Sequence, residues 1–82
     1  MNNSQRQAAI SGQLAKVTSK ATASTKMKEA FAGIPSKMEK VVGNEIQLLD
    51  TYDRIINQTN IQRKGILERL QKLSLQITEE SK

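Results

Sequence analysis

The side chains of this sequence that could do chemistry are carboxylates, hydroxyls and basic groups, because cysteine, histidine and tryptophan are absent. Without thiolate or imidazole groups, the chain has no Ser–His or Cys–His nucleophile pair and no soft metal ligand. Asp50 and Asp53 are spaced to share a helix face, but a calcium loop needs more oxygen ligands and a glycine at its turn. The four glycines are widely scattered and form no phosphate-binding loop. We therefore expect a protein that is not an enzyme and that binds no cofactor or metal.

The net charge of +5 is confined to the first half of the chain. Residues 1–40 contain seven basic and two acidic side chains, whereas residues 41–82 contain six of each. This asymmetry predicts that the first half meets an anionic surface, either an acidic protein face or an anionic membrane. The predicted contacts are Lys16, Lys20, Lys26 and Lys28. The alternative is a solvated face that only keeps the protein in solution.

The elements that must position these groups are predicted to be helices. With 82 residues, 37% apolar content and two aromatic side chains, the chain makes at most one domain with a small core. Apolar residues at spacings of four, three and four predict a basic amphipathic helix over residues 8–32, after a flexible N-terminus at 1–7. These residues are Ile10, Leu14, Val17 and Ala21.

Residues 33–36 predict a turn or kink. Gly33 can adopt the left-handed conformation that closes a helix, and Pro35 removes a backbone donor. Ser36 and Glu39 match a capping box, so the next helix is expected to begin at residue 37. The alternative is a kink within one continuous helix.

No proline interrupts residues 37–79, which predicts one long coiled-coil helix of about 65 Å, followed by a short tail at 80–82. A break near residues 57–60, where the sequence is polar, is the main alternative. Such a long helix needs an apolar face packed on something else.

The predicted fold class is therefore all-α, an elongated helical hairpin or kinked coiled coil within a multi-helix bundle. Its long helix has a heptad seam, and beside the seam runs a second apolar row that includes Leu48 and Ile55. Asp53, Asn60 and Arg63 interrupt the seam and are predicted to fix the register, unless the helix breaks there and leaves them in water. The first helix is too short to cover the second, so other chains are expected to cover the assembly face. That face comprises Val42, Ile46, Leu49, Ile56, Leu67, Leu70 and Ile77.

Residues 41–46 (VVGNEI) with residues 53–55 (DRI) resemble part of the SNARE motif, whose helices form four-helix bundles during membrane fusion. The resemblance implies a role in membrane trafficking. The layer that holds a glutamine in that family falls on Leu49 here, which puts this role in doubt.

The expected function is that of a small non-catalytic helical subunit that assembles with other helical chains, identical or different. A SNARE-like or peripheral membrane helix is the alternative, and non-specific nucleic-acid binding is a further one. Specific nucleic-acid binding is not expected, because the lysines are dispersed and aromatic stacking platforms are missing. We expect an intracellular chain, soluble or peripherally bound, since no apolar run approaches the roughly 18 to 20 residues of a membrane span.

Overall fold

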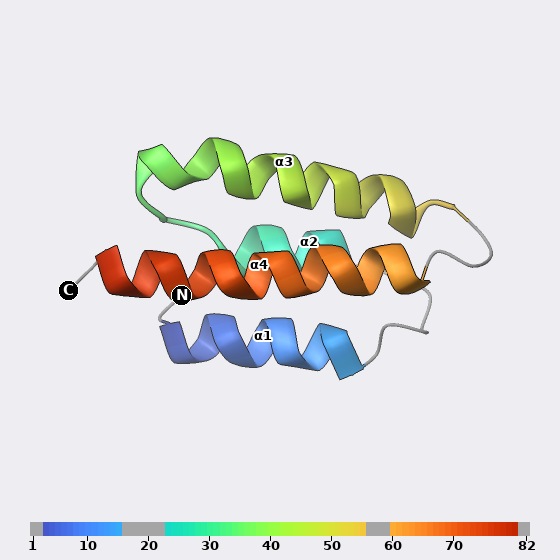
Figure 1. The fold of residues 1–82 in the computed structure, drawn as a ribbon, viewed down its shortest axis with the longest axis horizontal. Helices are drawn as coiled ribbons and strands as arrows, with labels where there is room; N and C mark the ends of the chain where they lie inside the picture. The colour runs from blue at the N-terminus through green and yellow to red at the C-terminus, as the bar shows by residue number, and fades with distance from the viewer. Residues whose placement is uncertain (1–2, 16–22, 56–59, 81–82) are drawn as a thin grey trace.

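The structure, a computed structural model, describes residues 3–15, 23–55 and 60–80. Within these ranges the chain forms four α-helices and no strand, which confirms the all-α class. Consecutive helices run in opposite directions, and each packs against two others in the cyclic order α1, α2, α3, α4 (Figure 1). In that view α4 lies in front of α2, with α3 above and α1 below. The helices are α1 (Asn3–Ala15), α2 (Ala23–Ala30), α3 (Ser36–Asp53) and α4 (Asn60–Glu80).

The prediction of two long helices is wrong in number. The predicted helix over residues 8–32 is divided into α1 and α2, and residues 3–7, predicted to be a flexible start, belong to α1. The predicted helix over residues 37–79 is interrupted as well, because α3 ends at Asp53 and α4 begins at Asn60. The chain leaves the helix before the alternative break near residues 57–60, of which residues 57–59 lie outside the described part. The molecule is therefore 40 Å long and 22 by 17 Å across, instead of a rod of about 65 Å.

The turn predicted between residues 33 and 36 is present. Gly33 has a φ of 78°, the left-handed conformation that glycine adopts without steric cost. The capping box is not formed, because α3 begins at Ser36 and Pro35 occupies the N-cap without a side-chain cap. Ser36 is thus the first helical residue and cannot cap its own helix. The amide of Met38 instead donates to the Pro35 carbonyl at 2.9 Å.

The end of α3 has no glycine or proline to mark it. After Asp53 the chain tightens, because the Arg54 amide donates to the Thr51 carbonyl at 3.3 Å and the Ile55 amide to the Tyr52 carbonyl at 3.2 Å. These bonds span three residues instead of four and satisfy carbonyl groups that a helix end leaves open.

One apolar core fills the space where the four helices meet. Because the long helix is broken, α3 and α4 lie side by side in opposite directions and bury each other's apolar faces. The helices α1 and α2 close the remaining two sides. The buried apolar residues are Ile10, Ala23, Met27, Ala30, Phe31, Ile34, Met38, Val42, Ile46, Leu49, Ile66, Leu67, Leu70 and Ile77.

Candidate functional site

The predicted assembly face lies in the chain's own core. Six of its seven residues are buried within the bundle, and Ile56 lies outside the described residues. The burial comes from α3 and α4 packing on each other and on the other two helices. In the folded bundle these six side chains are covered by the chain's own helices. The six buried residues are Val42, Ile46, Leu49, Leu67, Leu70 and Ile77.

Two of the polar residues predicted to interrupt the seam, Asp53 and Arg63, form an ion pair with each other. Arg63 Nε lies 3.0 Å from Asp53 Oδ1, and both side chains are 6% exposed. Asp53 Oδ2 also accepts a hydrogen bond of 3.0 Å from the Ser24 amide, in the first turn of α2. Amides in a first turn have no partner inside the helix, so this carboxylate caps α2. The third predicted residue, Asn60, begins α4, and its side chain lies outside the described part.

The neighbouring carboxylate, Asp50, is also held by structural bonds. The Ser24 hydroxyl donates to Asp50 Oδ1 at 3.2 Å, and Arg54 lies 2.9 Å from Asp50 Oδ2. The two aspartates that are spaced to share a helix face thus tie α2 to the end of α3. Across the described residues, no three histidine, cysteine or acidic side chains come together as a metal site.

Arg6 is a buried group that the sequence patterns did not single out. Its Nε donates to the Ala30 carbonyl at 2.9 Å, and its guanidinium lies 5.4 Å from the centre of the Phe31 ring. Burial removes water from the guanidinium and lowers the pKa of Arg6 from its ordinary value. The side chain satisfies a carbonyl at the C-terminal end of α2, where a positive charge is favoured by the helix dipole. Arg6 therefore attaches α1 to α2.

The remaining bonds between helices are polar and lie nearer the surface. Gln7 Nε2 donates to Ser74 Oγ at 2.9 Å, which connects α1 to α4. Arg69 Nε lies 3.1 and 3.0 Å from the two carboxylate oxygens of Glu45, which connects α4 to α3. No buried side-chain nitrogen or oxygen in the described part lacks a partner.

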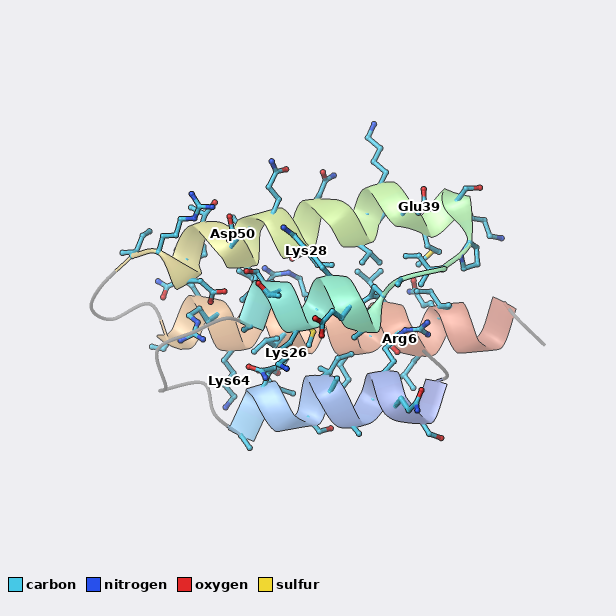
Figure 2. The ribbon with its side chains drawn as sticks, turned by 180° about the vertical axis from the view of Figure 1, so that it is seen from behind. Arg6, Lys26, Lys28, Glu39, Asp50 and Lys64 are labelled. Carbon is cyan, nitrogen blue, oxygen red and sulfur yellow. The ribbon has the colours of Figure 1, made fainter. Side chains whose placement is uncertain are left out.

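Of the predicted anionic contacts, the two that the structure describes point in different directions. Lys26 and Lys28 are exposed on α2, two positions apart, and thus about 200° apart around the helix. Figure 2 shows Lys28 directed toward α3 and Lys26 toward α1. Lys16 and Lys20 lie outside the described residues.

An open groove of about 350 Å³ lies between α2 and α3. Lys28 and Asp50 stand on its rim, and Ile46 and Gln47 also line it. Asp50 is already bonded to Ser24 and Arg54. The groove thus has few convergent polar groups, whereas a small-molecule site needs several to fix the orientation of its ligand.

The outer surface of α3 has a row of exposed apolar side chains. Val41, Leu48 and Ile55 are 47%, 40% and 48% exposed and follow one another at intervals of seven residues. We call these three residues the α3 stripe, and its last member, Ile55, lies two residues after the end of α3. Val41 and Leu48 lie four residues before and three after Glu45, so the stripe is on the side of α3 that borders α4. A seven-residue apolar interval is the spacing of a coiled-coil seam.

Part of this row is apparent in the sequence, where it is predicted to be a buried face. Leu48 and Ile55 belong to the second apolar row beside the heptad seam, which the sequence predicts to be buried by additional helices. The signal that separates the two rows on α3 is their spacing. The core row through Val42, Ile46 and Leu49 alternates intervals of four and three, and the α3 stripe repeats every seven residues beside it.

The fold defined by these contacts is an antiparallel four-helix bundle. Comparisons with protein families, with curated proteins and with solved structures find no match to this chain. Of the helices that the structure describes, none is both long enough and apolar enough to cross a bilayer.

Proposed function

We propose that this chain is a small non-catalytic helical bundle that assembles with another helical chain through the α3 stripe. The supporting observation is that Val41, Leu48 and Ile55 remain about half exposed at heptad spacing, although the rest of α3 contributes its apolar side chains to the core. Single exposed aliphatic residues are common on protein surfaces. Two of them on α3 and a third two residues after its end follow the spacing of the seam that a second helix packs against.

The reason for assembly differs from the one expected from the sequence. A long helix would have exposed a contiguous apolar face that another chain had to cover. The four-helix bundle already covers its core, so the bundle does not depend on a partner for folding. Assembly through the α3 stripe is then a contact between folded molecules, and it is reversible.

The size of the α3 stripe suggests a modest affinity. Full burial of an aliphatic side chain contributes about 1.5–3 kcal/mol, so covering the exposed half of three such residues contributes about 3 kcal/mol. The partner's own side chains add a similar amount. Association costs at least about 4 kcal/mol in lost translational and rotational freedom. The balance favours a transient contact over a permanent one.

The test compares two leucines that receive the same substitution. Leu48→Glu places a charge in the stripe, whereas Leu75→Glu places it on α4 at a side chain that is 53% exposed. Leu75 and Arg69 are six residues apart, about 240° around α4, so Leu75 does not face α3. Circular dichroism should show both variants folded, because both leucines are exposed.

Wild-type and variant chains are then compared by affinity capture with cross-linking mass spectrometry, and by sedimentation velocity over a concentration series. We expect Leu48→Glu to abolish capture of a helical chain cross-linked to α3 and Leu75→Glu to leave it intact. Equal behaviour of the two variants would refute the proposal. Loss of vesicle or duplex DNA binding in Leu48→Glu, with no protein partner, would favour the membrane or nucleic-acid alternative instead.

A further inference from the structure

The borders of the α3 stripe indicate what kind of helix fits it, an inference that rests on the proposed function. The positions between the apolar residues are Asn44 and Thr51, both exposed. Together with the stripe they give the three- and four-residue intervals of a two-stranded seam, in which Asn44 and Thr51 are the polar positions. The residues immediately before each apolar position form the outer edge of this seam, on the side away from α4. They are Lys40, Gln47 and Arg54.

The outer edge is basic. Lys40 is exposed, and the side chain of Arg54 is 78% exposed although it pairs with Asp50 four residues earlier. A guanidinium has five N–H donors, so Arg54 can also donate hydrogen bonds to a second carboxylate.

The inner edge of the seam, which borders α4 and contains Glu45 and Tyr52, does not offset the positive charge of the outer edge. Glu45 is its acidic residue, and both of its carboxylate oxygens accept hydrogen bonds from Arg69. The other inner-edge residue, Tyr52, is uncharged. A helix that docks on the α3 stripe therefore meets net positive charge at the outer edge of the seam and no net charge at the inner edge.

From these positions we infer that the partner is an amphipathic helix whose apolar seam is bordered by glutamate or aspartate. Residues at the edges of a helix seam select the partner through their charges. Acidic side chains beside the partner's seam would lie next to Lys40 and Arg54, whereas basic ones would be repelled.

A second copy of this chain fits the charges less well. Antiparallel pairing about Leu48 would place Lys40 of one molecule near Arg54 of the other, which brings like charges together. Parallel pairing would place Lys40 near a Glu45 that Arg69 already occupies. An anionic lipid surface fits the charge but not the shape, because Asn44 and Thr51 divide the apolar row, and a membrane-bound helix needs a broad apolar face.

The experiment uses the full chain and two synthetic helical peptides with the same isoleucine and leucine seam. One peptide has glutamate at both edges of the seam and the other has lysine. Binding is measured by fluorescence anisotropy at about 50 mM and about 500 mM salt, where screening lengths differ severalfold. We expect the glutamate peptide to bind at least tenfold more tightly at low salt, and we expect this preference to shrink at high salt.

Two charge-reversal variants test whether the outer edge of the seam causes the preference for the glutamate peptide. Lys40→Glu should reduce the preference for the glutamate peptide severalfold. The control Lys64→Glu changes an exposed lysine that Figure 2 shows on the α1 side of the bundle, away from α3, and should have no effect.

The outcomes separate this inference from the proposed function. If both peptides bind equally in a Leu48-dependent way, helix docking stands and the inferred acidic partner is wrong. If neither peptide binds, the proposed function itself fails. The inference is also overturned if sedimentation shows a dimer that Leu48→Glu dissolves. It is overturned equally if the chain floats with phosphatidylserine vesicles in a Lys40-dependent way while binding neither peptide.

Discussion

Arg63 Nε lies 3.0 Å from Asp53 Oδ1 in a pair whose side chains are almost fully buried, and this contact joins the last residue of α3 to the first turn of α4. The same aspartate accepts the Ser24 amide at the start of α2. Three helices therefore meet at one carboxylate.

Removal of this carboxylate should destabilise the bundle strongly. Asp53→Ala leaves Arg63 buried without its counter-charge and leaves the Ser24 amide without its acceptor. Breaking a buried pair in this way costs about 3–5 kcal/mol. A domain of this length has a total stability of about 4–12 kcal/mol, so the variant should be close to unfolding at room temperature. Urea denaturation followed by circular dichroism measures the loss.

Asp50→Ala is the matched control for Asp53→Ala. Asp50 is three residues earlier on α3, and its partner Arg54 is exposed. Surface pairs contribute about 0–1 kcal/mol, and the bond from the Ser24 hydroxyl adds about 1 kcal/mol, so the loss should be smaller than at Asp53. A loss at Asp50 as large as that at Asp53 would show that the buried pair has no special role in holding α2, α3 and α4 together.

Replacement of the buried arginine should loosen α1 in particular. Arg6→Ala removes the hydrogen bond to the Ala30 carbonyl and the contact with Phe31. Hydrogen bonds from charged donors contribute about 1.5–3 kcal/mol, and part of this is offset because the desolvated charge disappears. We expect a net loss of about 2 kcal/mol.

Hydrogen exchange measured by mass spectrometry should show that this loss is local. The α1 amides of Arg6→Ala should exchange faster, while those of α3 and α4 change less. Arg69→Ala, which removes a half-exposed arginine from α4, provides the comparison. Uniform acceleration over all four helices would contradict the role of Arg6 as the attachment of α1.

Two glycines should respond to alanine with opposite signs. Gly33 has a φ of 78°, so Gly33→Ala imposes a left-handed conformation on a residue with a side chain and should cost about 1 kcal/mol. Gly12 lies inside α1, and an added methyl group there meets no atom within 4 Å. Gly12→Ala should therefore stabilise the bundle by about 0.5–1 kcal/mol. Thermal denaturation of the two variants tests the pair, and destabilisation by Gly12→Ala would argue against a helical residue at this position.

Sequence reasoning could predict the helical class and the turn at Gly33, because both depend on local patterns. It could also identify Asp53 and Arg63 as polar residues within an apolar seam. It could not predict the contacts of Asp53 at the end of α3, because the Ser24 amide that this carboxylate accepts lies on α2, 29 residues earlier in the chain. Local propensity contains no information about such a partner. In a continuous helix without this end, the apolar residues that α3 and α4 bury against each other would need a partner chain to cover them.

A cross-linking experiment can distinguish the bundle from a single long helix. Glu45 and Arg69 are 24 residues apart, which would separate them by about 36 Å along a continuous helix. In the bundle their side chains meet at 3.0 Å on the surface. The chain has no native cysteine, so Glu45→Cys with Arg69→Cys gives two defined thiols. Loss of this exposed pair costs no more than about 1 kcal/mol, so the fold should survive.

A short bis-maleimide linker should join the two thiols within one molecule, and mass spectrometry should find a linked monomer as the main product in dilute solution. The control pair is Gln47→Cys with Arg69→Cys, because Gln47 lines the groove on the α2 side of α3 and faces away from α4. It should give little intramolecular product. If the first pair yields only linked dimers, α3 and α4 do not pack in the same chain, and the surface on which the α3 stripe is defined would not exist.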